Sequence, residues 1–450
     1  MARAQQISGW GRYPEVEATL RRARTRGDLC RLTGTQEPAG EARPRLAQGS
    51  RRTYGDGCLA GQVVSTLTMN HLLSFDAATG LLVAEAGLTL DDLLRFSVPR
   101  GWFLPVTPGT KHPTLGGCVA ADVHGKNHHL HGSIGAFVER LDMVLADGTC
   151  ARCSRRDHPE LFAATLGGMG LTGFIYAVAL RLTAIESSYI ETRTVRTANL
   201  AETCAALRDT QDEYVYSVAW VDLLCSARRR GRGLVILGNH ARSGFPGGQR
   251  RLALHQPPKL TVPEHLAALG LNRATARLFN GLYYRRQLRR DARAVVHYDP
   301  FFYPLDVAND WNRVYGRRGF LQYQFAVPFE GGEEFMAEFL DRIGRHRPGC
   351  TLAVLKTFGP QDGLLSFPMA GYTLAMDFPV ANGRIVEALS PLTDRVVEAG
   401  GRLYLAKDAI MERRQFEAMY PRLDEFRQIR RQYDPEGLFG SVQSDRLGLT

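Results

Sequence analysis

The stretch Pro105–Gly135, PVTPGTKHPTLGGCVAADVHGKNHHLHGSIG, decides the fold more than any other part of this 450-residue chain. It lacks helical or strand periodicity and contains six glycines: Gly109, Gly116, Gly117, Gly125, Gly132 and Gly135. Side chains that can carry out chemistry are interleaved with them: His124, Lys126, His128, His129 and His131. The pyrophosphate of a dinucleotide needs close backbone N–H groups and unobstructed turns, often at positive φ. The stretch therefore predicts a dinucleotide cradle beside a reactive site; the alternative is a solvated loop whose histidines cap turns.

A second glycine cluster follows in ELFAATLGGMGLTGFIYAVALRL, residues 160–182. Gly168, Gly170 and Gly173 formally satisfy G-x-G-x-x-G, the fingerprint of a Rossmann nucleotide site. That fingerprint needs a strand before it and a helix after it. Here a helical ELFAATL precedes and a β-rich FIYAVALRL follows, so the cluster predicts a turn from a helix to a strand.

Length and composition predict two domains, because 450 residues are many for one compact core. The chain is 44% hydrophobic and 23% charged, which is typical of a soluble globular protein. We find no apolar run long enough to span a bilayer and no apolar core of a secretory signal near the start. A cytoplasmic location, peripheral to the inner membrane surface if membrane contact is made, is the expectation.

The net charge of +10 is dispersed, and no nucleic-acid fold signature accompanies it, so we expect no nucleic-acid partner. An anionic substrate or lipid surface explains the charge better. Two denser patches, RRRGRG from Arg228 and YYRRQLRRDAR from Tyr283, predict either peripheral contact with anionic headgroups or ordinary solvated surfaces.

Lysine is rare, since the 56 basic residues include only Lys111, Lys126, Lys259, Lys356 and Lys407. A functional need for a compact and titratable ammonium group would explain why lysine occurs at these positions. The alternative is chance, which we accept for Lys259. No metal site is expected. The single C-x-x-C, Cys150 and Cys153, lacks a second pair, and the histidine cluster lacks helical ligand spacing.

The region from about 187 to 401 alternates longer segments. Strands are predicted at 319–328, 351–360, 372–380 and 401–408, with helices at 331–346 and 383–400. The order β-α-β-β-α-β is the split ferredoxin-like arrangement, here an antiparallel cap domain. Period-two alternation places Gln322 and Gln324 on one strand face and apolar residues on the other. Paired amides suit hydrogen bonding to sugar hydroxyls; a polar solvent face is the alternative.

Six motifs occur in one order over most of the chain: HGKNHH (124–129), AWVD (219–222), FLQYQF (320–325), LSFP (365–368), GRLYLAKD (401–408) and MYPRLDEF (419–426). On these motifs the chain resembles the decaprenylphosphoryl-β-D-ribose 2′-oxidase family, within the FAD-linked oxidases of the vanillyl-alcohol-oxidase type. The resemblance runs from about Gly9 to near the C-terminus. It implies an α+β fold of two domains: an FAD-binding domain (1–186), an antiparallel-sheet cap (187–401) and a C-terminal return to the FAD domain (402–450).

The resemblance also implies the cofactor site. GSRRTYGD, Gly49–Asp56, stands where the family wraps a loop around the FAD pyrophosphate. Arg51 occupies a position that is usually glycine, and Arg52 stands where related oxidases attach FAD through histidine, so FAD is expected to bind non-covalently. The implied cofactor contacts are Gly49, Arg52, Thr53, Tyr54, Gly55, Asp56, Gly109, Thr114, Gly116, Gly117, His124, Ile175 and Tyr404.

The implied activity is oxidation of the 2′-hydroxyl of a polyprenylphosphoryl β-D-ribofuranose to the keto sugar. An NAD(P)H-dependent short-chain reductase would complete epimerisation to the arabinose donor used in cell-wall arabinan. The implied catalytic residues are Lys407, His124 and Tyr54, with the proton acceptor open between Lys407 and His124. The implied substrate contacts are Lys126, Gln322, Gln324, Trp220 and Lys356. Three departures from the family, Phe302, Thr373 and Ala375, are expected to line the pocket.

Two other functions remain open on the sequence. A soluble FAD-dependent sugar, alditol or aldonolactone oxidase using O₂ would share the flavin motifs. A non-catalytic FAD-binding subunit would bind flavin without reducing it.

Overall fold

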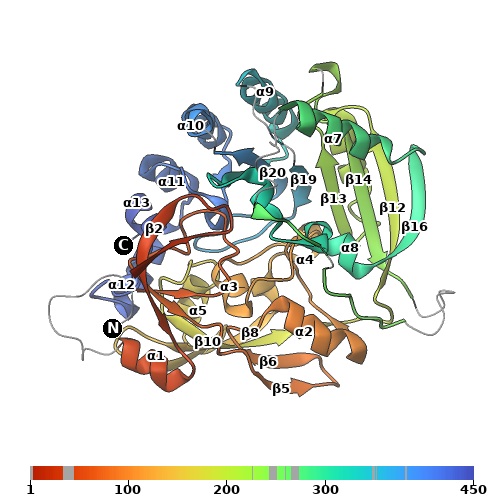
Figure 1. The fold of residues 1–450 in the computed structure, drawn as a ribbon. Helices are drawn as coiled ribbons and strands as arrows, with labels where there is room; N and C mark the ends of the chain where they lie inside the picture. The colour runs from red at the N-terminus through yellow and green to blue at the C-terminus, as the bar shows by residue number, and fades with distance from the viewer. Residues whose placement is uncertain are drawn as a thin grey trace.

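The computed structural model describes residues 4–33, 45–225, 227–242, 251–258, 260–264, 273–346, 350, 352–380 and 383–449. They form two lobes, with both ends of the chain on the first lobe (Figure 1). Lys259 lies outside the described residues. No described helix is long and apolar enough to cross a membrane.

The first lobe is built on two sheets. One contains β1 (Ala4–Ser8), β2 (Glu15–Arg22), β4 (Gln62–Ser65) and β3 (Arg45–Gln48), in that order. The other contains β5 (Leu72–Asp76), β6 (Leu81–Glu85), β10 (Phe174–Arg181), β8 (Val138–Val144) and β9 (Cys150–Ser154). The helices of this lobe are α1 (Arg26–Thr33), α2 (Leu90–Ser97), α3 (Leu115–Ala120), α4 (His128–His131) and α5 (Pro159–Thr165). The short strands β7 (Trp102–Phe103) and β11 (Thr183–Ala184) pair beside them.

The glycine cluster at 168–173 joins α5 to β10, which confirms the predicted turn from a helix to a strand. β10 is nearly all apolar and buried because it lies at the centre of its sheet. Gly170 and Gly173 both have positive φ, a conformation that glycine adopts without steric cost.

The second lobe is one eight-stranded sheet. Its strands, in order, are β16 (Asp291–His297), β12 (Tyr189–Thr197), β14 (Gly233–His240), β13 (Tyr216–Val221), β19 (Ala353–Phe358), β20 (Gly371–Pro379), β18 (Phe320–Pro328) and β21 (Arg402–Leu403). Every pairing in this sheet is antiparallel. Because β21 belongs to it, the cap sheet extends two residues past the expected boundary at 401.

The predicted β-α-β-β-α-β order is confirmed in the second half of this sheet, by β18, α9 (Gly332–Arg345), β19, β20, α10 (Arg384–Glu398) and β21. The same order recurs, unpredicted, in the first half, through β12, α6 (Leu200–Asp209), β13, β14, α7 (Arg273–Arg285) and β16. The two halves meet edge to edge where β13 pairs with β19. The two halves of the cap therefore share the strand order of the ferredoxin-like arrangement.

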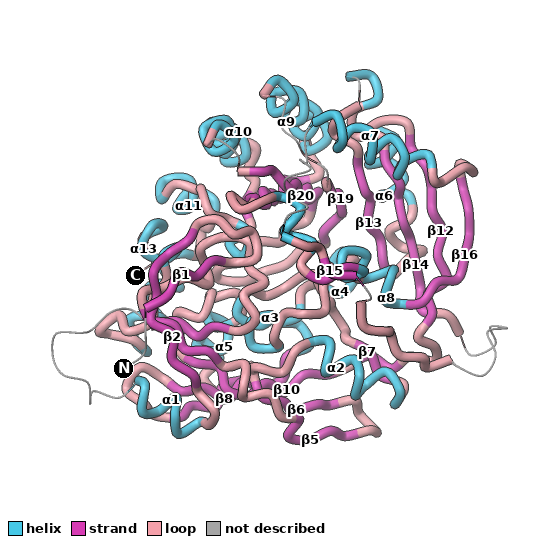
Figure 2. The backbone as a smooth tube through the Cα atoms, viewed as in Figure 1, coloured by secondary structure: helices cyan, strands magenta, loops and turns pink. Residues whose placement is uncertain are grey.

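The two faces of the cap sheet differ. Helices α6, α9 and α10 pack against one face, whose apolar side chains include Tyr323, Phe325 and Leu355. The opposite face carries Gln324 and Ala375, which lie directly across from each other on neighbouring strands. Figure 2 shows the strands of this sheet beside the first lobe, and both Gln324 and Ala375 line a cavity that residues of the first lobe also line. The alternation therefore presents the glutamines to the space between the lobes.

The chain ends on the first lobe with α11 (Arg413–Met419), α12 (Leu423–Tyr433) and α13 (Val442–Leu447). The N–H of Arg45 donates to the carbonyl of Leu438 at 2.7 Å, so the tail runs beside β3. Arg446 of α13 binds Asp56 of the first lobe through two hydrogen bonds of 2.8 and 2.9 Å. Strands and helices from opposite ends of the sequence thus form one lobe.

Candidate active site

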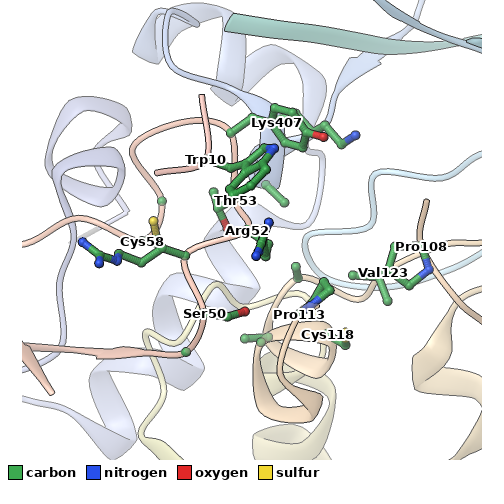
Figure 3. A pocket seen from close by; sticks show the side chains of 18 of the residues that line it. Trp10, Ser50, Arg52, Thr53, Cys58, Pro108, Pro113, Cys118, Val123 and Lys407 are labelled. Atoms are coloured by element: carbon green, nitrogen blue, oxygen red, sulfur yellow. The ribbon is translucent and has the colours of Figure 1, made fainter. Parts of the chain in front are cut away.

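A cavity lies between the lobes. One wall is the loop 47–58 together with Trp10 and the start of α3, and the other is formed by strands β18, β19 and β20 of the cap. Figure 3 shows Trp10, Arg52 and Thr53 facing the segment of Pro113 and Cys118, with Lys407 at the cap end. A molecule held here would contact both lobes.

Most of the residues expected from sequence line this cavity: Gly49, Arg52, Thr53, Tyr54, Gly109, Thr114, Gly116, Gly117, His124, Ile175, Gln322, Gln324, Lys356, Tyr404 and Lys407. Four expected residues do not line it: Gly55, Asp56, Lys126 and Trp220. Eight glycine, threonine, proline or histidine residues of the stretch Pro105–Gly135 line the cavity, which supports the predicted cradle over a solvated loop.

Steric constraints explain why glycine occupies positions in the cradle. A Cβ on Gly49 would lie 2.1 Å from the hydroxyl oxygen of Thr114, and a Cβ on Gly116 would lie 2.7 Å from the Cβ of Ala86. A Cβ on Gly109 would meet nothing within 4 Å, because that residue faces open space. Gly49 and Gly116 therefore allow close packing of the backbone, and Gly109 borders open space. A large ligand fits a site of this kind.

Arg51 departs from the usual glycine, yet its backbone keeps a glycine-like path. Its φ is 52°, in the left-handed region that costs an ordinary residue about 1–2 kcal/mol. The loop therefore turns at this position as a glycine loop would, with an exposed arginine side chain.

FAD fits the donors of this cavity. The guanidinium of Arg52 lies 3.8 Å from the ring centroid of Trp10, and its buried Nε has no hydrogen-bond partner among the described residues. Nδ1 of His124 is likewise buried without a partner in the part of the chain that is described. Unpaired buried donors are costly unless a ligand satisfies them. A pyrophosphate beside Arg52 and a flavin ring near His124 would do so.

Lys407 lies at the cap end of the cavity, on the turn after β21. Its ammonium donates to Oε1 of Gln322 and sits 4.7 Å from the ring centroid of Tyr54. Nε2 of Gln322 in turn donates to the fully buried carboxylate of Asp377. Burial lowers the pKa of Lys407 to about 8, and the Asp377 carboxylate opposes that change. Asp377 thus fixes the amide orientation that presents an acceptor to Lys407.

His124 is held in one tautomer. Its Nε2 lies 3.1 Å from the amide nitrogen of Gln324, which also donates to the hydroxyl of Thr373 at 3.0 Å. The amide nitrogen can only donate, so Nε2 of His124 accepts and Nδ1 carries the proton. Burial, together with the nearby charges of Lys356 and Lys407, lowers the pKa of His124 well below its usual value. His124 is therefore a neutral donor whose accepting nitrogen is already occupied.

Two further lysines surround this wall. Lys356 lines the cavity, and burial together with Lys407 and Lys126 lowers its pKa to about 7. Lys126 lies behind the wall, where its ammonium donates to the carbonyl of Phe301 and sits 4.4 Å from the Phe301 ring centroid. Burial lowers the pKa of Lys126 to about 7. Three of the five lysines thus share one electrostatic neighbourhood, in which only Lys356 and Lys407 reach the cavity.

The remaining expected residues have structural roles. Trp220 packs its ring 4.7 Å from that of Tyr283 on α7 and does not line the cavity. A Cβ on Gly55 would lie 1.7 Å from the carbonyl oxygen of Asp408, so this loop packs directly on the C-terminal segment. Asp56 binds Arg446 rather than the cavity. Sequence similarity places these residues in the motif but does not distinguish ligand contact from support.

The three residues that depart from the family pattern also differ in whether they line the cavity. Ala375 lines the cavity, as expected. Phe302 does not, because its ring is buried between Phe103 and Tyr216. Thr373 also does not, because it lies under Gln324 and donates to the carbonyl of Phe325. The expectation that all three line the pocket was wrong for Phe302 and Thr373.

Sequence reasoning missed an aromatic and apolar part of the wall, formed by Trp10, Leu305, Trp311, Leu352 and Val354. Trp10 and Trp311 lie 301 positions apart in sequence, yet their ring centroids are 5.9 Å apart. Period-two alternation along β19 places Leu352 and Val354 on the face of Lys356, which is the one signal that could have found them.

Comparisons with known proteins agree with this geometry. A family model described as an FAD binding domain matches residues 38–154, and one described as D-arabinono-1,4-lactone oxidase matches residues 385–447. The decaprenylphosphoryl-β-D-ribose oxidase of Mycolicibacterium smegmatis is 37% identical over 454 residues, covering 99% of this chain and 98% of that protein. An uncharacterised Streptomyces coelicolor protein is 33% identical, covering 80% of this chain and 100% of that protein. A putative D-arabinono-1,4-lactone oxidase of Neurospora crassa is 32% identical over only 30% of this chain and 26% of that protein.

The two-lobed α+β fold, the glycine cradle and the FAD-domain match define an FAD-dependent oxidoreductase of the vanillyl-alcohol-oxidase type. Similarity at 37% identity over nearly the whole of both chains makes the assignment narrower. This chain belongs to the decaprenylphosphoryl-β-D-ribose oxidase family.

Proposed function

We propose that the protein oxidises the 2′-hydroxyl of a polyprenylphosphoryl β-D-ribofuranose to the 2′-keto sugar. The single observation that carries this proposal is the cap wall of the cavity, which is lined by Gln322 and Gln324 of β18, Lys356 of β19 and Lys407 on the turn after β21. Amides match sugar hydroxyls, and ammonium groups match a phosphodiester. The relative from Mycolicibacterium smegmatis, named for a substrate of this chemistry, supports the same choice.

Lys407 is the proton acceptor in this proposal. Its pKa of about 8 leaves roughly a tenth of the amine neutral at pH 7 and more at higher pH, which is enough for a general base. His124 cannot take this role in its observed tautomer, because its accepting nitrogen is bound by Gln324. The hydrogen bond to Gln322 orients the amine toward the cavity while its lone pair remains available for the substrate hydroxyl.

FAD, when bound, supplies the acceptor for the hydride that leaves the carbon bearing the hydroxyl. The protein orients that carbon. No described donor reaches the carbonyl oxygen of Gln324, so this oxygen is available to accept from a second sugar hydroxyl. Lys356 is placed to bind the phosphate, and that anion would raise its lowered pKa and keep it charged.

The rest of the epimerisation requires a second enzyme. We propose an NAD(P)H-dependent short-chain reductase that returns the keto sugar to the opposite configuration, together with a cytoplasmic location at the inner membrane surface. The alternative, an aldonolactone oxidase, has weaker support. The family model of that description matches only residues 385–447, and the putative lactone oxidase of Neurospora crassa matches 30% of this chain.

The test is turnover of farnesylphosphoryl β-D-ribofuranose by the purified protein with a dye as electron acceptor. Lys407→Met should lower kcat/KM by about 10²–10⁴-fold, the range for loss of a general base, while the protein still binds FAD. The matched control is Lys356→Met, which should raise KM for the phosphorylated substrate and leave kcat nearly unchanged. An active Lys407→Met variant, or equal turnover of free ribose, would contradict the proposal.

A further inference from the structure

Exposed apolar side chains gather in one part of the cap. Among the described large hydrophobic residues, those more than half exposed are Leu260, Leu278, Phe279, Leu282, Leu288 and Val307. All of them fall between residues 260 and 307, and four belong to α7 or the turn that follows it. Single exposed apolar residues are common, but such a concentration marks an interaction surface.

The orientation of α7 explains this exposure. Its inner side buries Ala276 and Asn280, whose amide donates to the carboxylate of Asp222 at 3.0 Å. Leu278 and Leu282, four residues apart, lie together on the outer side, with Phe279 one turn before Leu282. The outer side of α7 is therefore an apolar stripe without protein cover in the described structure.

α7 also lies on the cavity side of the cap sheet. Trp220 is paired with Val354 across strands β13 and β19, so both side chains point to one face, and Val354 lines the cavity. Tyr283 of α7 packs on Trp220. In Figure 1, α7 crosses in front of β13 and β14. The apolar stripe thus adjoins the face of the sheet that binds substrate.

The surrounding charge is strongly positive. Residues 277–293 contain six arginines and one acid, Asp291, which accepts three hydrogen bonds from the side chain of Arg193. Arg285 and Arg289 are exposed beside the stripe. The other basic patch differs, because its Arg230 and Arg232 pair with Asp341 and Asp222. Arginines flanking an exposed apolar stripe are typical of a helix that lies in a membrane interface.

We propose that α7 and the turn 286–290 bind the surface of a bilayer that contains anionic lipids. Leucine and phenylalanine side chains enter the headgroup boundary, and the arginines contact lipid phosphates. The inference deepens the proposed function, because a polyprenyl chain anchored in the bilayer would bring its sugar to the cavity along the face that α7 shares.

The experiment is co-sedimentation of the full-length flavoprotein with vesicles of phosphatidylcholine alone and of phosphatidylcholine mixed with phosphatidylglycerol. We expect binding to the mixed vesicles that weakens at high salt. Leu278→Ser with Leu282→Ser should reduce partitioning by more than about tenfold. Arg285→Gln with Arg289→Gln should reduce it by about fivefold for each arginine. The matched controls are Leu67→Ser with Leu73→Ser and Arg22→Gln with Arg156→Gln, exposed residues of the first lobe that should have no effect.

Equal binding by wild type and both α7 variants, or no binding to mixed vesicles, would overturn the inference. Sedimentation velocity of the protein without lipid tests whether the stripe is instead an interface between copies of this chain. If the wild type self-associates and the leucine variant does not, while vesicles bind neither, the stripe joins copies of this chain and the inference is wrong. Turnover of the short-chain substrate in solution should be unchanged in the leucine variant, so vesicle binding and the proposed activity can fail independently.

Discussion

Lys407 lies among three kinds of neighbour: an amide oxygen that accepts its hydrogen bond, an aromatic ring and other positively charged groups. Lys356 and Lys407 titrate at about 7 and 8 because both are removed from water, and Lys407 further lowers the pKa of Lys356. The scarcity of lysine in the sequence pointed to these residues. Their pKa values could not be predicted, because burial and the Asp377–Gln322 contact arise only when strands β18 and β20 pair.

The pH profile of kcat/KM tests the role of Lys407. In a Lys356→Met background, where no phosphate-binding lysine loses its charge in this range, a neutral Lys407 amine that accepts the proton should make kcat/KM rise with pH and level off above about pH 8. A fall in kcat/KM through the same range would instead assign the work to the ammonium form. Steady-state rates with farnesylphosphoryl ribofuranose across this range provide the measurement.

Asp377→Asn provides the matched variant for that profile. The carboxylate raises the pKa of Lys407, so its neutralisation should move the midpoint to lower pH while the side chain keeps its shape. A variant with a slower rate and an unmoved midpoint would show that Asp377 supports the fold without tuning Lys407.

The helices and strands of the cap show why its β-α-β-β-α-β order was predicted from sequence in the second half only. Alternation along β18 and the apolar face of α9, with Phe335, Phe339 and Ile343 buried, identified the second unit. In the first unit, α7 exposes its apolar stripe and lies opposite α6, so its pattern does not follow burial against the sheet. The repeat is visible only in the strand pairing.

The loop 49–56 gives a prediction at the same scale. Arg51 has φ 52°, so Arg51→Gly should relieve its backbone strain and raise the free energy of unfolding by about 1 kcal/mol or less, with FAD retained. The control is Arg22→Gly in β2, an exposed strand position where glycine should cost about 0.5–1 kcal/mol. Urea unfolding measures both, and equal destabilisation of the two variants would contradict the account of the loop.

Across the whole molecule, the two ends of the chain are joined at the site. Arg446 of α13 binds Asp56 at the end of the cofactor loop and Asp408 directly after Lys407, at 2.8–2.9 Å. The sequence predicted that the C-terminus returns to the first lobe, but it assigned Asp56 to the cofactor. A contact between residues 390 positions apart leaves no local pattern, so its structural role could not be read from the chain.

Arg446→Met should test this junction. It leaves two buried carboxylates without their partner, a change that typically costs about 3–5 kcal/mol, and it frees the turn that holds Lys407. We expect lower stability in urea and weaker FAD binding. The control Arg413→Met removes an exposed pair with Glu417 and should change stability by less than about 1 kcal/mol. Equal effects of the two variants would show that the junction is not essential.

The most direct test of the central claim is anaerobic flavin reduction by farnesylphosphoryl β-D-ribofuranose carrying deuterium at C2 or at C3 of the ribose. The account predicts that absorbance of the oxidised flavin bleaches, that deuterium at C2 slows the bleaching several-fold, and that deuterium at C3 does not. Bleaching slowed only by deuterium at C3, or the absence of bleaching, would contradict oxidation at the 2′ position.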